Sequence, residues 1–320
     1  MITPHYYENF RCIGSECKNN CCCGEWEIEV DNDALERFAK ICGDFGDKVR
    51  GSINSENVFV RKNGRCPMLA ENGLCEMVLN GEQLCTVCDE YPRFTEYFDD
   101  YIERGISLSC EAAAEIILDN TEEFQLDGTT GECEEEFFKL LLSARGKIFR
   151  ILQDRTKDIC TRIRLVLDYG EKLQERINDN DYSKFSYKPC DTYIRKESLS
   201  PFVEFLTTLD YLDSGWVDVL NDFDADTAKD EQKLEQIAVY FVYRYFLKSA
   251  FDCDVLSKLK FMALSVITIN ALAVPCGNLY ESARRYSVEV EHNEENVDLI
   301  YDEFLFNEDL SSEKIIGMIN

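Results

Sequence analysis

Apolar residues recur every three or four positions along the second half of the chain, from about residue 132 to the end. This spacing places the apolar side chains on one face of a helix. The pattern predicts seven helices, over residues 132–155, 158–178, 198–212, 229–250, 255–275, 279–289 and 293–306. Two stretches, 237–251 and 255–273, are apolar nearly all round, which is typical of helices that are buried on every side. We expect this pair to form the centre of a helical half, with exposed acidic connections over 181–191 and 222–230.

The first 130 residues carry patterns of shorter elements. Residues 24–30 alternate apolar and acidic side chains, which is the pattern of a half-buried strand, and residues 58–60 form a second short run of strand-forming residues. A hairpin is expected over 94–108. It is predicted to turn at Asp99–Asp100, because aspartate tolerates the backbone conformations of tight turns.

Two helices are predicted in the same part of the chain. Asp31 and Asn32 precede a helical periodicity that reaches Cys42, so the side chain of one of them is expected to cap the first turn of that helix. A second helix is expected over 112–117. Together these patterns predict an α+β protein. A small cysteine-rich, metal-binding domain with short strands over residues 1–130 is followed by a mostly α-helical domain over 131–320.

Composition and charge narrow the class of protein. The 320 residues are 45% hydrophobic and 30% charged, as in soluble globular proteins. The net charge of −28 leaves no basic face for nucleic acid. Residues 1–5 lack the features of a signal peptide, and the longest apolar run, 261–276, is too short to span a membrane. We therefore expect a cytoplasmic protein that neither inserts into membranes nor binds nucleic acid.

The sixteen cysteines are distributed unevenly. Five fall between Cys12 and Cys23, and six more follow by Cys110. Thiols so close in sequence either pair as disulfides or share a metal. Cytosolic thiols are kept reduced, so metal or iron–sulfur ligation is favoured over a disulfide framework. The nine candidate ligands are Cys12, Cys17, Cys21, Cys22, Cys66, Cys75, Cys85, Cys88 and Cys110.

The spacing of these thiols restricts the kind of site. A C-x2-C at Cys85 and Cys88, brought against the dense first group, would supply the four sulfurs of a tetrahedral or cubane site. Nine thiols exceed that need, so either two sites exist or some thiols are supports. With only two histidines in the chain, an all-sulfur site is indicated, and zinc and iron–sulfur are not separable by spacing. Gly24 stands where the C-x3-C-x2-C triplet of radical enzymes requires cysteine, so a radical mechanism is unsupported.

The remaining cysteines are isolated in the sequence, except Cys23, which leaves open which of the adjacent thiols bind. Isolated cysteines are ordinarily buried or half-buried thiols that act as small apolar side chains. This is the expectation for Cys42, Cys133, Cys160, Cys190, Cys253 and Cys276.

A series of short motifs carries a family resemblance. In the first half these are Cys12-x4-Cys17-x3-Cys21-Cys22 with Gly24 and Trp26, Gly64-Arg65-Cys66-Pro67, Gly73-Leu74-Cys75, Leu84-Cys85-Thr86-Val87-Cys88-Asp89-Glu90-Tyr91-Pro92-Arg93 and Leu108-Ser109-Cys110. In the second half they are Lys260-Phe261, Ala271-Leu272, Ala283-Arg284-Arg285-Tyr286-Ser287 and Glu291-His292-Asn293-Glu294 with Asn296. This ordered set resembles the flagellin lysine-N-methylase family, which shares its cysteine pattern with zinc- or iron-chelating domains. The chain departs from the family at Cys23 and Glu25, and at Glu111, where proline is usual.

The resemblance implies transfer of methyl groups from S-adenosylmethionine to lysine side chains of flagellin or another lysine-bearing protein. It also implies a cysteine-ligated iron–sulfur cluster, of the 4Fe–4S type, with zinc as the alternative. The chain shows no Gly-rich loop of the doubly wound methyltransferases, so the methyl donor would need another architecture. The alternative function is a non-enzymatic iron- or zinc-binding protein that stores, senses or delivers metal.

A methyltransferase of this kind needs a pocket for two cations, the sulfonium and the lysine. Aromatic faces and carboxylates suit both. The candidates for a pocket between the two halves are Tyr91, Arg93, Tyr286, Glu291 and His292. Each also has a structural interpretation, as a turn, an ion-pair partner or a cap, so no catalytic base is assigned. Trp26 is expected to shield the metal from water.

Overall fold

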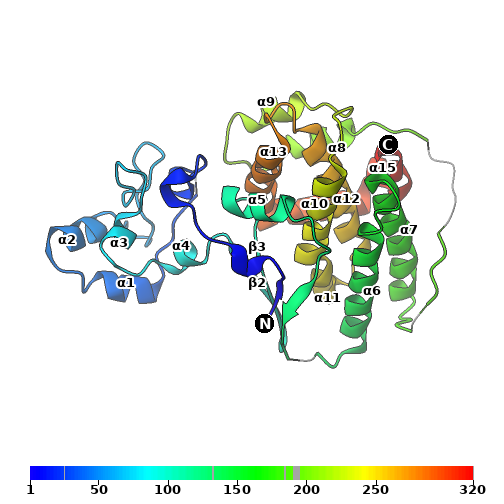
Figure 1. The fold of residues 1–320 in the computed structure, drawn as a ribbon, viewed down its shortest axis with the longest axis horizontal. Coiled ribbons are helices and arrows are strands. Elements are labelled where there is room, and N and C mark those ends of the chain that lie inside the picture. Colours follow the sequence, from blue (N-terminus) through cyan, green and yellow to red (C-terminus); the bar gives the residue numbers. More distant parts are fainter. Residues whose placement is uncertain (25, 132, 184, 190–194, 320) are drawn as a thin grey trace.

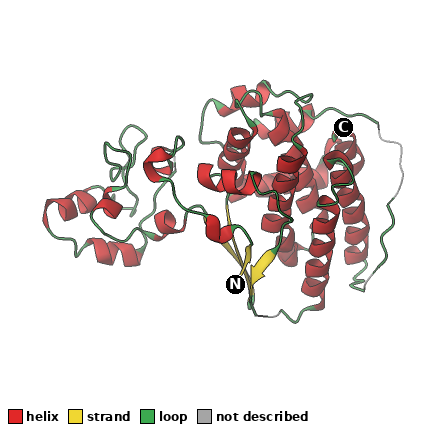
Figure 2. Ribbon diagram, in the orientation of Figure 1, coloured by secondary structure: helices red, strands yellow, loops and turns green. Residues whose placement is uncertain are grey.

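The computed structural model describes residues 1–24, 26–131, 133–183, 185–189 and 195–319. Figure 1 shows two lobes that meet near the N-terminus. The small lobe, residues 12–91, is built from short helices and loops, and the large lobe, residues 1–11 and 92–319, is a stack of longer helices with a sheet at one edge (Figure 2). The predicted mixture of α and β structure is confirmed.

The helices of the small lobe are α1 (Asn32–Phe38), α2 (Gly43–Gly51), α3 (Glu76–Leu79) and α4 (Thr86–Glu90). The strands are β1 (Ile2–Pro4), β2 (Arg93–Phe98), β3 (Tyr101–Ile106) and β4 (Leu126–Gly128). The helices of the large lobe are α5 (Glu111–Leu118), α6 (Glu136–Leu152), α7 (Ile159–Asn178), α8 (Ser200–Leu206), α9 (Trp216–Asn221), α10 (Glu231–Tyr245), α11 (Ser249–Asp252), α12 (Val255–Ala271), α13 (Leu279–Tyr286), α14 (Glu294–Phe306) and α15 (Ser312–Met318).

The four strands form one sheet in the order β2-β3-β1-β4. The predicted hairpin is confirmed, because β2 and β3 pair antiparallel and turn at Asp99, whose φ of 52° is one that aspartate tolerates. Strand β1 adds to β3 in parallel, with Ile2 opposite Glu103. The Tyr243 hydroxyl of α10 donates to the Arg104 carbonyl at 3.1 Å, so the sheet is fastened to the helices of the large lobe.

The prediction of two short strands in the small lobe, over 24–30 and 58–60, is wrong. Only a single-residue bridge, Glu29 to Val58, joins the two segments, supported by Val30 N–H donating to the Asn57 carbonyl at 2.7 Å. In the first predicted strand Ile28 and Val30 still face inward, and in the second Phe59 is buried while Val60 is exposed. Their alternation reflects packing against this small core rather than a ladder, because no further strand extends the pair in the described chain. The core residues are Ile28, Val30, Ala34, Phe38, Val49, Phe59, Cys66, Met68, Met77 and Cys85.

Helices α10 and α12 form the centre of the large lobe, as predicted. Residues such as Phe241 and Phe261 are fully buried and their rings meet edge to face at 5.2 Å. Helix α7 also approaches α12 closely, since a methyl group at Gly170 would lie 2.5 Å from Leu259 Cδ1. The connection 222–230 is mostly exposed, as expected, and the described part of 181–191 is half-buried or exposed.

Several predicted helix boundaries need correction. The helix predicted over 229–250 ends at Tyr245 and is followed by a 3-10 turn and the short α11, and the one predicted over 198–212 spans only α8. The segment predicted as 279–289 is α13 followed by a π-helix over Ser287–Glu291. Helices α2, α9 and α15 were not predicted, because short helices leave too few periods for an apolar stripe to stand out. No helix in the described residues is long and apolar enough to cross a membrane.

Candidate thiol centre at the junction of the lobes

Asn20 fixes the end of the loop that carries Cys17 to Cys23. Asn20 Oδ1 accepts from Cys22 N–H at 2.9 Å, which caps the 3-10 turn Cys21–Cys23. The same side chain donates through Nδ2 to the Gly73 carbonyl at 3.3 Å, so this loop is fixed against the turn before Cys75. Sequence reasoning missed Asn20, because its second partner is distant in the chain.

Cys21, Cys22 and Cys66 form the first group of thiols. Cys66 N–H donates to the Cys22 carbonyl at 2.8 Å, which brings the two segments together. The Cys22 thiol is hydrogen-bonded to the sulfurs of both neighbours, and this bond lowers the pKa of Cys21 and of Cys66 to about 7. The same bonds, together with burial, raise the pKa of Cys22.

Cys85 and Cys88 form a second group at the start of α4. Asp31 Oδ2 accepts from Thr86 N–H at 2.7 Å, while its Oδ1 accepts from Ala34 N–H at 2.8 Å, so the predicted cap of α1 is confirmed and also fixes α4. The hydrogen bond from Cys88 lowers the pKa of Cys85.

The second group lies within electrostatic reach of the first. The hydrogen bond to Cys85 and burial raise the pKa of Cys88, and the charges of Cys66 and Cys21 raise it further. Burial raises the pKa of Cys75, with smaller contributions from the charges of Cys66 and Cys85. Cys75 therefore lies within electrostatic reach of one thiol of each group.

Cys17 and Cys110 lie within electrostatic reach of each other where the two lobes join, and Glu111 fixes the loop that carries Cys17. Glu111 Oε2 accepts from Lys18 N–H at 2.9 Å and from Asn19 N–H at 3.0 Å, and the Cys17 thiol donates to it at 3.5 Å. Burial raises the pKa of Cys17 to about 12, and the charges of Glu111 and Cys110 add to that rise. Burial likewise raises the pKa of Cys110, with contributions from Cys21 and Cys12.

The nine candidate thiols are thus linked by hydrogen bonds or electrostatic interactions, and no disulfide forms among the cysteines that the structure describes. Within the described ranges, no group of three or more Cys, His, Asp or Glu side chains is close enough to hold a metal ion. The soft thiol donors fit zinc or an iron–sulfur cluster. The protons that now link the sulfurs are the ones that metal binding would release. Which of the nine would be ligands stays a prediction.

Trp26 lies between the two lobes. Its ring lies 5.5 Å from that of His292, at the end of the π-helix in the large lobe, and 6.2 Å from that of Tyr91 in the small lobe. Arg61 Nε donates to the Trp26 carbonyl at 2.6 Å and fixes the loop that carries the ring. Tyr91 in turn donates to Ser109 Oγ at 3.3 Å, next to Cys110.

Glu291 precedes His292 in the chain and carries a buried carboxylate. Its Oε2 accepts from the Tyr245 hydroxyl at 2.8 Å and the Tyr240 hydroxyl at 3.0 Å, and it lies 3.5 Å from Arg244 Nε. Its Oε1 is buried and has no hydrogen-bond partner, and the same holds for Nδ1 of His292. Burial lowers the pKa of His292, so this ring is neutral at pH 7. A π-helix carrying two orphaned polar atoms is typical of a functional position.

The five predicted pocket residues therefore do not all lie at one site. Tyr91, Glu291 and His292 lie at or beside the junction, whereas Tyr286 is buried in the large core, where its hydroxyl meets Ser265 Oγ at 3.0 Å. The guanidinium of Arg93 lies over the Phe10 ring at 5.1 Å and donates to a backbone carbonyl.

The isolated cysteines differ in their burial. Cys133 and Cys160 are buried and Cys276 is half-buried, as expected. The prediction is wrong for Cys42 and Cys253, which are exposed because they stand at helix ends, before α2 and after α11. Cys190 lies outside the described residues.

Comparison with known proteins finds similarity to lysine methylases. Two proteins named Lysine-N-methylase, from Salmonella choleraesuis (strain SC-B67) and Salmonella typhimurium (strain LT2), are each 24% identical to this chain over 145 residues, 41% of the chain. This match spans 35% of the length of each relative. The Flagellar biosynthetic protein FliU of Salmonella muenchen is 24% identical over 142 residues, 39% of this chain and 81% of that protein. No family model and no solved structure matches the chain. The predicted resemblance to the flagellin lysine-N-methylase family is confirmed by this similarity, over about two fifths of the chain.

Proposed function

We propose that this protein is a lysine N-methyltransferase that transfers methyl groups from S-adenosylmethionine to a lysine-bearing protein, flagellin being the first candidate. The observation that carries the proposal is the sequence similarity to proteins named Lysine-N-methylase. The matched region spans 35% of those proteins, so donor, substrate and activity are all part of the proposal.

We further propose that the nine thiols hold a cysteine-ligated metal centre, an iron–sulfur cluster of the 4Fe–4S type or zinc. The groups around Cys22 and Cys88 are the primary ligand candidates, because their sulfurs already exchange hydrogen bonds. When bound, the metal would supply cross-links between loops that are otherwise fastened by a few hydrogen bonds. Displacement of a methyl group from a sulfonium involves no redox step, so the centre is assigned a structural role.

The junction offers what a lysine substrate requires. An ammonium group has a pKa of about 10.4, so its deprotonation at pH 7 costs about 4–5 kcal/mol. Neutral His292, with an orphaned Nδ1, is suited to accept that proton. The faces of Trp26 and Tyr91 are suited to a cation. The roles proposed for these residues are the same whether the metal centre is an iron–sulfur cluster or zinc.

Incubation with S-adenosylmethionine and flagellin tests the activity. Protein purified without oxygen is expected to bind S-adenosylmethionine in calorimetry and to add methyl groups to flagellin lysines, read by mass spectrometry. His292→Gln is expected to lose most of the turnover while donor binding is kept. Absence of both donor binding and methylation would contradict the proposal. It would favour the alternative that the thiols serve metal storage, sensing or delivery. The described part of the structure pairs none of them as disulfides.

Metal content is tested separately. Anaerobic protein is expected to be brown, with broad visible absorption from an iron–sulfur cluster, whereas colourless protein with stoichiometric zinc would identify the alternative. The combined change Cys21→Ser, Cys22→Ser, Cys85→Ser and Cys88→Ser is expected to remove the metal and unfold the small lobe, because structural metal binding contributes about 10 kcal/mol to folding. The matched control is Cys42→Ser, an exposed thiol of the same lobe. Metal retained by the fourfold variant would place the site elsewhere.

A further inference from the structure

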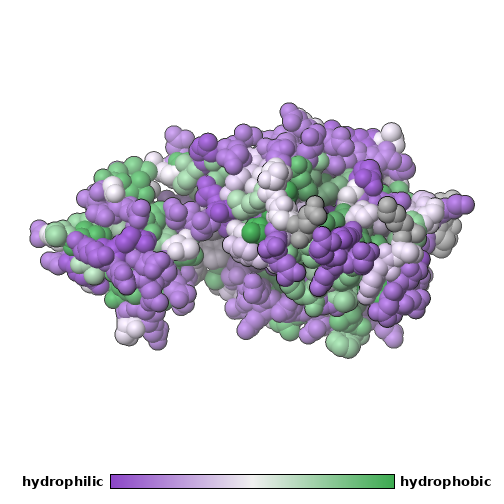
Figure 3. Space-filling model, turned by 90° about the horizontal axis from the view of Figure 1, so that it is seen from below, coloured by the Kyte–Doolittle hydropathy of each residue, from purple (hydrophilic) through white to green (hydrophobic). Residues whose placement is uncertain are grey.

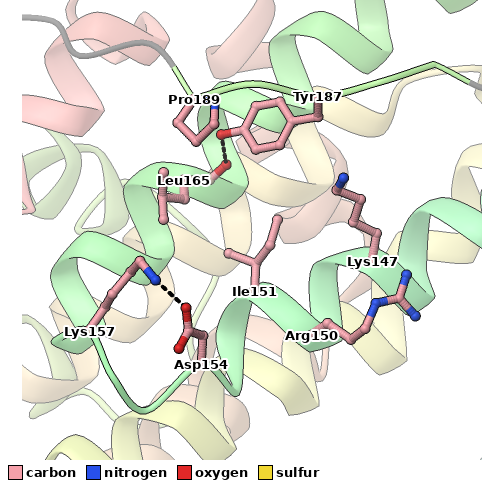
Figure 4. A pocket seen from close by; sticks show the side chains of 8 residues that line it. All are labelled: Lys147, Arg150, Ile151, Asp154, Lys157, Leu165, Tyr187 and Pro189. Atoms are coloured by element: carbon pink, nitrogen blue, oxygen red, sulfur yellow. Dashed lines mark hydrogen bonds and ion pairs between the residues drawn. The ribbon is translucent and has the colours of Figure 1, made fainter.

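A cleft on the far side of the large lobe is unrelated to the thiols. It lies between α6, the start of α7 and the segment 187–189, and has a volume of about 290 Å³ (Figure 4). Figure 4 shows Lys147 and Arg150 on one side, Lys157 and Asp154 on the other, and Tyr187 above them. Its lining residues are Lys147, Arg150, Ile151, Asp154, Lys157, Leu165, Tyr187 and Pro189.

The cleft is positively charged, whereas the molecule as a whole is negatively charged. The chain has a net charge of −28, yet this lining holds three cations and one carboxylate. That carboxylate, Asp154, is already ion-paired with Lys157 and accepts from the Thr156 hydroxyl at 2.5 Å. Lys147 and Arg150 form no ion pair with any carboxylate in the part of the chain that the structure describes. The positive charges of Lys147 and Arg150 in the cleft therefore remain uncompensated.

Lys147 is held in place by two aromatic rings, whereas Arg150 is exposed. Lys147 and Arg150 lie three residues apart on α6 and so project from the same side of the helix. The ammonium of Lys147 lies over the rings of Tyr169 and Tyr187, at 5.6 and 5.3 Å from their centroids. The Tyr187 ring is fixed in turn, because its hydroxyl donates to the Leu165 carbonyl at 3.0 Å.

The floor between the charged sides is apolar. Ile151 from α6 and Leu165 from α7 line it, and both are half-buried. Tyr187 covers it with a ring whose hydroxyl also meets Asp168 Oδ2 at 2.8 Å, so that hydroxyl is already engaged within the protein. A ligand here would find positive charge on one side and apolar surface beneath it.

We propose that this cleft binds a small organic phosphate, with its phosphoryl group on Lys147 and Arg150 and its apolar body on Ile151 and Tyr187. A phosphomonoester carries close to two negative charges at neutral pH, which matches the two uncompensated cations. The guanidinium fork suits phosphate oxygens, and the lysine adds a point charge. The cleft is open to solvent, and its volume of about 290 Å³ is close to the lower end of the range for small-molecule sites. The site is independent of the proposed methyl transfer.

Calorimetric titration of the full chain at low salt tests the proposal, with phenyl phosphate, inorganic phosphate and succinate as probes. Phenyl phosphate is expected to bind several-fold more tightly than inorganic phosphate, because it also covers the apolar floor. Binding of both is expected to weaken as salt is raised. The double variant Lys147→Gln, Arg150→Gln is expected to lose at least tenfold in affinity for phenyl phosphate, with an unchanged circular dichroism spectrum.

The matched control is Lys62→Gln, which removes one positive charge from an exposed position in the small lobe. Its affinity for phenyl phosphate is expected to equal that of the unaltered protein. Binding undetected for either phosphate would overturn the proposal, as would a double variant that binds normally. A loss of similar size in Lys62→Gln would show a general charge effect, and succinate binding as tightly as phenyl phosphate would contradict the phosphate assignment.

Discussion

Glu111 connects the thiol loop to the large lobe through a single carboxylate. The residue begins α5, and its Oε2 accepts from the backbone of Lys18 and Asn19 and from the thiol of Cys17. A hydrogen bond to a charged acceptor contributes more than one to a neutral acceptor. The two backbone bonds are exposed, so their value lies in position more than in stability: they fix the loop that carries Cys17 against the start of α5.

Glu111→Ala is expected to release this loop. The amides of Lys18 and Asn19 should exchange with solvent faster, measured by hydrogen exchange. The free energy of unfolding should fall by only about 1 kcal/mol, because the buried alanines of α5 still pack in the core. Glu115→Ala, an exposed position on the same helix, is the control and should change neither. Unaltered exchange at both amides in Glu111→Ala would show that the carboxylate does not hold the loop.

Asp31 gives a second prediction, on pH. Hydrogen bonds from Thr86 and Ala34 lower the pKa of Asp31 to about 2, below its usual value of 3.8. The stability that these bonds provide is therefore complete above about pH 4 and is lost as the pH falls through 2. Asp31→Asn keeps the ability to cap α1 but not the charge. Its stability deficit, measured by thermal unfolding from pH 6 to 2, should shrink as the pH falls. A constant deficit would contradict this assignment.

These two carboxylates show what the sequence can and cannot predict at this scale. The cap by Asp31 was predictable because its partner amide is three residues away. The bonds of Glu111 reach back more than ninety residues, and its only sequence signal was that it replaces a proline of the resembling family. The orphaned Oε1 of Glu291 was equally hidden, because an unsatisfied atom is a property of packing.

At the scale of elements, helix periodicity succeeded where helices were long. Helices α6, α7, α12 and α14 lie where the apolar spacing predicts them. The apolar alternation over 24–30 failed, because the same pattern suits a loop that packs every second residue on a small core. The π-helix after α13 could not be predicted, because its wider turn leaves the apolar spacing almost unchanged.

The contact of α7 with α12 can be tested with one methyl group. Gly170→Ala would place a carbon 2.5 Å from Leu259 Cδ1 in a closely packed core. Such overpacking is expected to destabilise the protein by about 1–3 kcal/mol, measured by urea unfolding. Gly146→Ala on α6 is the matched control, because its nearest neighbour lies 3.9 Å away. There the helix propensity of alanine should stabilise by about 0.5–1 kcal/mol. Two variants of equal stability would contradict the packing argument.

The whole molecule is organised around two cores of unequal strength. The large lobe has an extended core that includes α5 to α7, α10 and α12, and it also takes in residues near the N-terminus such as Tyr6 and Phe10. The small lobe buries only a few apolar side chains, two of them cysteines. Figure 3 shows a hydrophilic surface that is hollowed where the lobes meet. The small lobe is therefore the part whose folding a bound metal would influence most.

Both aromatic and polar side chains connect the lobes, so the contribution of the aromatic contact is open to a direct test. Trp26 contributes the aromatic contact with His292, and Asn19 Nδ2 donates to Glu281 Oε2 at 3.1 Å. Trp26→Ala is expected to free the small lobe, increasing the radius of gyration in small-angle scattering, while the unfolding temperature of the large lobe stays the same because Trp26 lies outside its core. Trp26→Phe keeps a ring and should restore most of the compactness. A scattering curve unaltered by Trp26→Ala would mean that the polar contacts alone fix the junction, and the aromatic contact would then lose its place in the proposed substrate site.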